Sequence, residues 1–504
     1  MGAVGLLAAG CAPVHPTTPA PTRSVDHTPG GFADWDALAS ALTGTLTRPG
    51  DESYDSARLV ENPRYDDARP IAVLTAASAE DVAAGIAYAI QHAVPLALRS
   101  GGHSYTGRSA GGAGGTGMPA SLVIDTRGMT DVTISDDNTV RIQAGASLAE
   151  VYAALGNAGR AIAAGSSATV GATGLTLGGG VGVLVRAYGL TCDSLTEVEI
   201  VTADGKLRTT SRTLEPKLFW ACQGGGGHLG VVTALTLSTH KAPQVTIFSL
   251  SWPFSAAATV VKAWQAWAPQ AAPKLWSSLR LLAGTAHPDG PGLSLSGTWI
   301  GPKEQLTAQL TPFLQAIEVT PSHNGSSSHS YLDAMMGYAG CAGIPLAQCQ
   351  TGAGGRLTRE SSSAASHLPW VPLTNAGIAT LIAQVSAASA VPGLTEGGVS
   401  LDALGGAVRT IAPTATAFPH RTALMAVQYT ATFPNGLDPA PFDDYVRRFR
   451  AALVPQWGDS AYVNYADASL TDPDASYFGV NAARLATVRA EYDPTGLFQQ
   501  PQGY

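Results

Sequence analysis

The chain has 504 residues, of which 45% are apolar and 13% are charged. This composition predicts a folded protein of about two or three domains. The formal net charge of -8 is spread along the sequence without a basic stripe, so we expect no nucleic-acid partner. No run approaches the roughly 18 apolar residues of a membrane span, and no group of His and Cys has metal-ligand spacing, so we expect no metal.

The N-terminus, MGAVGLLAAGC, is a short apolar run that ends at Cys11 and is followed by a Pro- and Thr-rich stretch. It resembles the end of a bacterial lipoprotein signal whose start has been cut off. Residues 1–30 would then be a signal and linker outside the fold, and the protein would be exported, with membrane contact only through a lipid anchor on Cys11. The alternative is a tail with an incidental cysteine, which would leave the protein in the cytoplasm.

Strand-like and helix-like segments alternate between residues 70 and 240. Short apolar runs predict strands at 71–74, 96–98, 122–125, 140–143 and 198–202. Amphipathic segments predict helices at 80–92 and 148–155. The pattern indicates an α+β domain.

The second half has a different texture. Strand-like runs at 245–251, 293–299 and 423–432 accompany a helix at 256–268, which predicts an antiparallel sheet covered on one face by helices. The C-terminal part predicts a tyrosine-rich strand and then a helix at 482–491. Cys341 and Cys349 lie close enough in sequence to close a small disulfide ring if the compartment is oxidising.

The segment ALRSGGHSYTGRS at 97–109 carries the strongest local signal. Paired glycines after a strand let successive N–H groups converge on an anion. The segment is neither a Rossmann fingerprint nor a P-loop. His103 stands at its apex, where an imidazole is nucleophilic enough to attach to an electrophilic cofactor carbon. The alternative is a surface turn with a solvated histidine.

Two further Gly-rich segments, at 165–195 and 218–233, also adjoin predicted strands. One such loop is weak support for a ligand site. Three of them favour a ligand of some length, because glycine is entropically costly to order.

These segments, together with TAFPHR (416–421), AYVNYAD (461–467), YFGVNAARL (477–485) and YDPTGLFQQPQ (492–502), resemble the FAD-linked oxidases of the vanillyl-alcohol-oxidase superfamily. The similarity is greatest to the berberine-bridge-enzyme-like branch and runs from about residue 60 to the end. It implies a PCMH-type FAD-binding domain of two α+β subdomains at 31–240. It further implies a substrate domain at 241–454 and a C-terminal segment, 455–504, that returns to the FAD domain.

The resemblance also implies a reaction. FAD would take a hydride from an alcohol-type (CH–OH) carbon of a small organic or sugar substrate, and O2 would reoxidise it to give H2O2. A dehydrogenase of the same fold with another electron acceptor is one alternative. A non-catalytic, flavin-free binding protein that keeps the fold is another.

The cofactor residues follow from the same resemblance. His103 would be joined covalently to the 8α-methyl carbon of FAD. The other cofactor-binding positions are Ser100, Gly101, Gly102, Ser104 and Gly107 at the pyrophosphate, Gly171, Gly174, Gly178 and Gly179 along the flavin and ribityl chain, Val232 through its backbone, and Asn464 near the ring.

Two positions near the flavin bear on the number of covalent links to the cofactor and on its reaction with oxygen. Ser167 stands where many relatives carry a cysteine that makes a second bond to the flavin, so we predict a single link, through His103. Val170 matches a position that resembles an oxygen gate, where a modest side chain favours oxidase over dehydrogenase chemistry.

For proton transfer, Tyr465 matches the position of the general base in relatives, and Tyr462 and Gln428 are the other candidate catalytic residues. A free tyrosine is a poor base at neutral pH, so the role requires a stabilised phenolate. Gln428 would hydrogen-bond the substrate. The alternative for both tyrosines is an ordinary half-buried position in a sheet.

Overall fold

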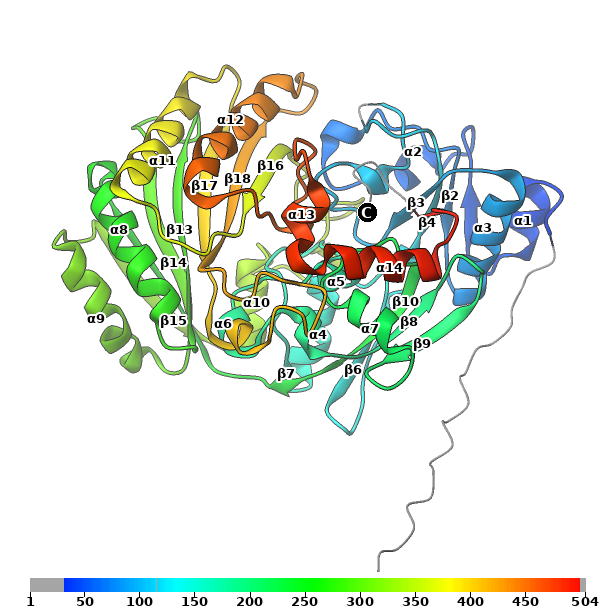
Figure 1. Cartoon of the computed structure of the whole chain (residues 1–504), viewed down its shortest axis with the longest axis horizontal. Helices are drawn as coiled ribbons and strands as arrows, with labels where there is room; N and C mark the ends of the chain where they lie inside the picture. Colours follow the sequence, from blue (N-terminus) through cyan, green and yellow to red (C-terminus); the bar gives the residue numbers. More distant parts are fainter. Residues whose placement is uncertain (1–30, 115, 499–504) are drawn as a thin grey trace, which may run out of the picture.

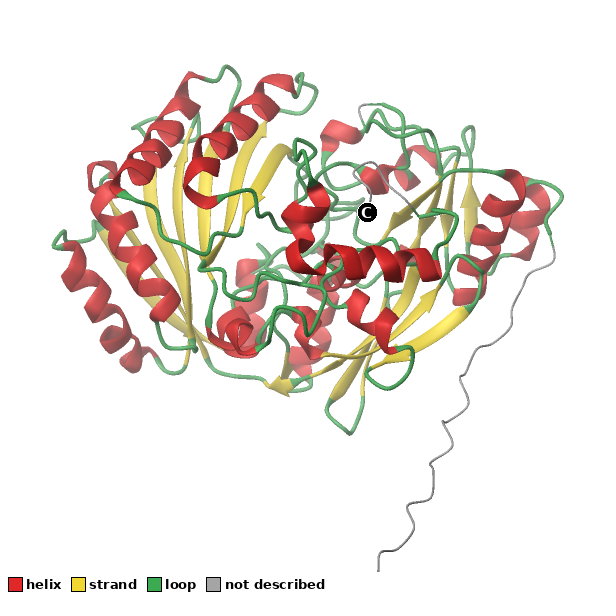
Figure 2. Ribbon diagram, in the orientation of Figure 1, coloured by secondary structure: helices red, strands yellow, loops and turns green. Residues whose placement is uncertain are grey.

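The computed structural model describes residues 31–114 and 116–498. The expected signal and Cys11 lie outside the described residues. Two lobes lie side by side, one built on two smaller sheets and the other on a large sheet with helices along its outer face (Figures 1 and 2). Among the helices of the described part, none is long and apolar enough to cross a membrane.

The first sheet of the N-terminal lobe has the strand order β1-β2-β4-β3. Its strands are β1 (Thr45–Thr47), β2 (Ala72–Thr75), β4 (Leu122–Asp125) and β3 (Leu96–Arg99). The last three run parallel, and helix α3 (Ala79–His92) forms the crossover between β2 and β3. Ser78 caps α3 by accepting a hydrogen bond from the Asp81 amide, as residues of its type commonly do. The strands predicted at 71–74, 96–98 and 122–125 and the helix predicted at 80–92 are confirmed.

The second sheet has the order β5-β6-β10-β8-β9 and is antiparallel. Its strands are β5 (Val132–Ile134), β6 (Thr139–Gln143), β10 (Val231–Ser238), β8 (Leu195–Val201) and β9 (Leu207–Ser211). Helix α4 (Leu148–Asn157) begins with a capping box between Ser147 and Glu150. The short helix α5 (Ala172–Leu177) lies within the second Gly-rich segment, residues 165–195.

The second lobe contains one seven-stranded sheet in which every neighbouring pair is antiparallel. In spatial order the strands are β15 (His323–His329), β12 (Val245–Trp252), β14 (Gly292–Ile300), β13 (Leu275–Ala283), β17 (Glu396–Ala403), β18 (Met425–Phe433) and β16 (Ser361–His367). Helices cover one face of it (Figure 2), namely α9 (Leu306–Ile317), α8 (Ala257–Trp267), α11 (Asn375–Ala387) and α12 (Ala440–Trp457). The predicted helix-covered antiparallel sheet is confirmed.

This sheet has one apolar and one polar face because side chains alternate along a strand. Leu279, Leu401 and Val427 point to the helices and belong to the buried core of the lobe. Their neighbours on the opposite face include Arg280, which is exposed, and Gln428. The open face is therefore the polar one.

The C-terminal segment returns to the first lobe through α13 (Pro473–Phe478) and α14 (Ala482–Tyr492), and α14 packs on α7 (Pro216–Cys222). The tyrosine-rich strand predicted before them is wrong. Residues Val463–Tyr465 form a 3-10 turn, closed by the Tyr465 amide donating to the Tyr462 carbonyl at 2.9 Å. Cys341 and Cys349 form a disulfide.

Candidate active site

A cavity of about 570 Å³ opens between the Gly-rich segments of the first lobe and the C-terminal segment. This volume lies within the ordinary range of small-molecule and cofactor sites. The loop after β3, the start of α5, the Gly-rich loop before β10 and residues 463–466 line it. The three glycine-dense segments singled out in the sequence thus meet at one place.

The loop after β3 holds its shape through glycines. Gly102 and Gly107 adopt left-handed backbone conformations, with φ of 76° and 70°, which other residues seldom reach. A Cβ on Gly101 would stand 2.1 Å from the amide nitrogen of Gly171. Only glycine therefore allows the first two Gly-rich segments to touch.

His103 projects from this loop into the cavity with its side chain 20% exposed. Its Nε2 lies 2.9 Å from the Thr169 hydroxyl and 3.8 Å from a carboxylate oxygen of Glu61. Burial lowers the pKa of His103 to about 4, and a hydrogen bond to the Thr169 backbone opposes that shift only in part. The imidazole is therefore neutral at physiological pH, which is the nucleophilic form.

Asn464 lies at the far wall of the cavity. Its amide nitrogen donates to the Leu175 carbonyl at 2.8 Å and to the Tyr462 hydroxyl at 2.9 Å. A Cβ on Gly178 would stand 2.0 Å from the Asn464 amide oxygen. The absence of a side chain on Gly178 therefore leaves space for the Asn464 amide, and Gly178 does not itself line the cavity.

Two tyrosines form a stack at the wall of the cavity. The rings of Tyr105 and Tyr465 lie 5.5 Å apart and 3° from parallel, and the Gln428 amide donates to the Tyr105 hydroxyl at 2.5 Å. Burial raises the pKa of Tyr105 to about 12. Burial, followed by the neighbouring Tyr105 and Asp402, raises the pKa of Tyr465 well above its usual value, and Arg280 opposes that rise.

Tyr462 has a different environment. Its hydroxyl is buried and accepts hydrogen bonds from the Gly180 amide at 2.8 Å and the Val181 amide at 3.3 Å. It holds the glycine turn in place behind Asn464 and does not reach the cavity.

The polar face of the large sheet completes the surroundings of Tyr465. Arg280, Ser400 and Gln428 occupy one row across β13, β17 and β18, and Asp402 lies two residues further along the same face. Arg280 and Asp402 both act electrostatically on Tyr465. The row therefore presents charged and hydrogen-bonding groups beside the stacked tyrosines.

The structure brings most of the predicted site residues to the cavity wall. Those that line it are Ser100, Gly101, Gly102, His103, Ser104, Ser167, Val170, Gly171, Gly174, Val232, Asn464 and Tyr465. Those predicted but absent from the wall are Gly107, Gly178, Gly179, Tyr462 and Gln428.

Sequence reasoning missed four residues here, namely Glu61, Tyr105, Arg280 and Asp402. Tyr105 could have been found from the sequence, because it lies in the Gly-rich segment 97–109, two residues after His103. The other three come from distant parts of the chain and carried no local signal. Among residues 31–114 and 116–498, no group of three or more His, Cys, Asp or Glu could hold a metal ion.

Comparison with known proteins identifies the family. The FAD binding domain family matches residues 70–211, and the family described as berberine and berberine like matches residues 461–503. The chain is 32% identical over 471 residues to an FAD-linked oxidoreductase of Bacillus subtilis (YgaK), covering 92% of this chain and 96% of that protein. The chain belongs to the berberine bridge enzyme-like family of FAD-linked oxidoreductases.

More distant relatives include the chitooligosaccharide oxidase of Gibberella zeae, 28% identical over 451 residues, which covers 86% of this chain and 87% of that one. Among solved structures, a chitooligosaccharide oxidase matches with a TM-score of 0.82 at 25% identity. BBE-like 1 of Physcomitrella patens matches with a TM-score of 0.83 at 26% identity. Each match covers 93% of this chain and 98% of the other. The predicted α+β fold with a PCMH-type FAD-binding domain is confirmed.

The residues of this berberine bridge enzyme-like protein fit FAD. Ser100, Gly101, Gly102 and Ser104 line the cavity, and Gly102 has a left-handed backbone conformation. Such glycine-containing turns are typical of sites that bind an anion such as a pyrophosphate. The α5 glycine Gly174 has no heavy atom within 4 Å of its would-be Cβ, which leaves room for a planar ring system. When bound, FAD supplies a two-electron acceptor for hydride. The protein is an FAD-dependent oxidoreductase, as the sequence predicted.

Proposed function

We propose that this enzyme is an oxidase that removes a hydride from a CH–OH carbon of a small organic or sugar substrate, with O2 taking up the electrons as H2O2. The single observation that carries the proposal is the stacked pair Tyr105 and Tyr465 at the wall of the FAD cavity, beside the polar row of the large sheet. Relatives named chitooligosaccharide, xylooligosaccharide and glucooligosaccharide oxidase support a sugar-like substrate.

In this proposal Tyr465 takes the proton of the substrate hydroxyl. Its side chain is partly buried and lines the cavity, where a substrate hydroxyl would contact it. Gln428 orients the site through the Tyr105 hydroxyl. Tyr462, although a candidate in the sequence, acts as a positioning residue for Asn464 because its hydroxyl is already engaged by the backbone.

His103 forms the covalent link to the cofactor, and it forms the only one. Nε2 is engaged with Thr169, which leaves Nδ1, for which no hydrogen bond is found within the described residues, to bond the 8α carbon. Ser167 lines the cavity but has no thiol. The second link to the flavin, a thioether from a cysteine at this position in many relatives, therefore does not form.

Residues 31–240 and 455–504 hold FAD, and residues 241–454 bind the substrate. We place the enzyme outside the cytoplasm, with Cys11 as the attachment point for a lipid. Mass spectrometry of the membrane-associated protein tests that anchor.

The first experiment asks whether flavin stays with the acid-precipitated protein. Wild type should give a yellow pellet, and His103→Ala a colourless one after the same FAD supply. A yellow pellet from the variant would show that another residue carries the link. A colourless wild type that also fails to retain FAD before acid treatment would favour the non-catalytic binding protein.

A second experiment separates oxidase from dehydrogenase. Val170 lines the cavity and packs partly buried against the core, so Val170→Leu narrows the space beside it. Peroxide formation with a panel of sugars and alcohols should fall in this variant while dye reduction by the same substrates persists. Equal oxygen consumption in both proteins would remove Val170 as the gate. Dye reduction without oxygen consumption in wild type would favour the dehydrogenase.

A further inference from the structure

Glu61 lies beside the attachment histidine and has no role in the chemistry described so far. Its carboxylate oxygen Oε2 is 3.8 Å from Nε2 of His103, and the two side chains are 24% and 20% exposed. The Glu61 amide also donates to the Gly102 carbonyl at 3.1 Å. The segment that carries Glu61 is thus joined to the loop that carries His103 by its backbone as well.

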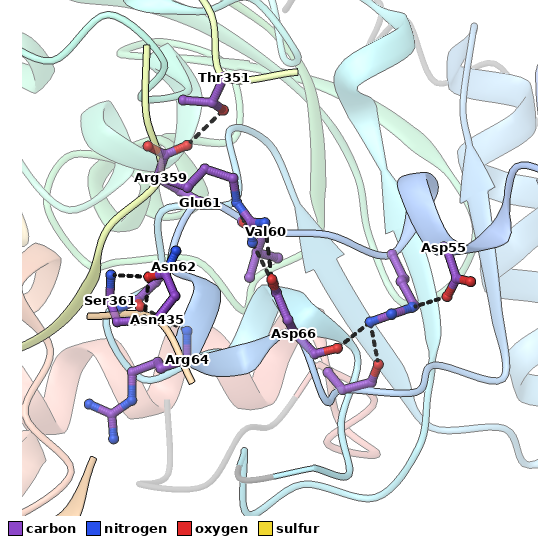
Figure 3. A network of polar contacts seen from close by, with 12 residues as sticks. Asp55, Val60, Glu61, Asn62, Arg64, Asp66, Thr351, Arg359, Ser361 and Asn435 are labelled. Carbon is purple, nitrogen blue, oxygen red and sulfur yellow. Dashed lines mark hydrogen bonds and ion pairs between the residues drawn. The ribbon is translucent and has the colours of Figure 1, made fainter. Parts of the chain in front are cut away.

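A polar network from the second lobe holds this carboxylate in place (Figure 3). The Thr351 hydroxyl donates to Glu61 Oε2 at 3.2 Å. Arg359 donates to the Val60 carbonyl at 2.9 and 2.6 Å and pairs with Asp66 at 3.1 and 2.5 Å. Residues about 300 positions apart in sequence therefore fix the geometry between Glu61 and the imidazole.

The charges around Glu61 suit a group that exchanges a proton. Burial raises the pKa of Glu61 above its usual value, while the hydrogen bond from Thr351 and the charge of Arg359 oppose that rise. The titratable and charged groups that face it are His103, Arg359 and, through Arg359, Asp66. A carboxylate with a raised pKa is a stronger proton acceptor than an ordinary one.

We infer that Glu61 is the proton acceptor for the formation of the covalent link between His103 and FAD. The inference rests on the proposed link. A bond forms between Nδ1 of His103 and the 8α carbon. One C–H bond at that carbon and the Nε2–H bond of the imidazole break: the C–H proton passes to solvent, its electron pair passes to the flavin ring, and Glu61 receives the Nε2 proton. The two electrons released reduce the flavin ring, and O2 then accepts them together with two protons to give H2O2.

The geometry explains why a carboxylate is needed at this point. Once Nδ1 has bonded to carbon, the ring would carry a positive charge unless it loses the Nε2 proton. Burial disfavours that charge, as the lowered pKa of His103 shows. The Thr169 hydroxyl at Nε2 can accept a hydrogen bond but cannot retain a proton. Glu61 is the neighbour that can.

The test measures how fast the link forms, independently of turnover. The full chain is produced in riboflavin-starved cells, FAD is added, and samples are quenched in acid at intervals to measure flavin fluorescence in the precipitate. The variants are Glu61→Gln, Thr351→Val and, as a matched control, Glu52→Gln, an exposed carboxylate of the same lobe. Non-covalent FAD affinity is measured in the His103→Ala background with and without Glu61→Gln.

We expect Glu61→Gln to slow the formation of the covalent link by about tenfold or more. The rate of linkage should also lose the part of its pH dependence that comes from titration of Glu61. The affinity for FAD, measured in the His103→Ala background, should not change. Thr351→Val should move that part of the pH dependence to higher pH. The hydrogen bond from Thr351 holds the pKa of Glu61 down, so removing it raises that pKa. Glu52→Gln should match wild type.

A wild-type rate in Glu61→Gln would overturn the inference, and so would a loss of FAD affinity as large as the loss of rate. If wild type itself releases all its flavin into acid, the proposed covalent link fails, and this result is distinct from a failure of Glu61 alone.

Discussion

Replacing Gly178 with alanine places a methyl group where Asn464 now lies. The new Cβ would stand 2.0 Å from the Asn464 amide oxygen and 2.6 Å from its Cγ, so the side chain must move. It then loses its hydrogen bonds to the Leu175 carbonyl and the Tyr462 hydroxyl. The loss of two hydrogen bonds costs about 2 kcal/mol and crowding adds about 1–3 kcal/mol, while the stiffer unfolded chain offsets about 0.4–1 kcal/mol. The free energy of unfolding should fall by about 2–5 kcal/mol.

Urea unfolding at one fixed concentration of free FAD measures this change, because bound ligand adds to apparent stability. Gly337→Ala is the matched control. Gly337 is an exposed glycine in helix α10 (Tyr331–Tyr338), and its added Cβ would meet nothing within 4 Å. This variant should gain about 0.4–1 kcal/mol. If Gly178→Ala unfolds within about 0.5 kcal/mol of wild type while Gly337→Ala behaves as expected, the close approach of Gly178 and Asn464 does not exist in solution.

Two further predictions concern catalysis and pH. Tyr465→Phe should slow flavin reduction by substrate about 10²–10⁴-fold in stopped-flow measurements and leave the acid-stable flavin content unchanged; an equal loss of flavin would assign Tyr465 to cofactor binding instead. Burial lowers the pKa of His367 to about 3 and of His420 to about 4, whereas unfolded histidine titrates near 6.5. The unfolded chain therefore binds more protons below about pH 6.5, and the free energy of unfolding should fall as the pH drops, by up to about 1.4 kcal/mol per pH unit for each histidine. Urea titrations at about pH 7.5 and 5 check this, and His420→Asn should show a shallower slope than wild type.

Local signals in the sequence were sufficient where neighbouring residues decide the structure. The helix predicted at 80–92 is α3, with apolar residues at helical spacing and a serine cap, and the strand predicted at 122–125 matches β4. The three Gly-rich segments, which predicted a ligand of some length, line the same cavity.

The sequence could not predict structure that depends on distant contacts. The stretch around Tyr462 and Tyr465 predicted a tyrosine-rich strand. Instead, the Asn464 side chain donates to the Leu175 carbonyl, 289 residues earlier in the chain, and residues Val463–Tyr465 form a 3-10 turn. Glu61 lies in a segment without any cofactor motif. Its place beside His103 depends on the fold of the first lobe, and its hydrogen bond from Thr351 depends on the contact between the two lobes.

The state of Tyr465 before substrate binds follows from its neighbours. Burial disfavours a phenolate, and Asp402 disfavours it further. Burial likewise raises the pKa of Asp402, which Arg280 opposes. Interacting acids do not ionise independently, and a phenol has a far higher ordinary pKa than a carboxyl group. The general-base role proposed for Tyr465 therefore requires its phenolic proton to leave. Of its two charged neighbours, Arg280 favours the phenolate that this role needs and Asp402 disfavours it.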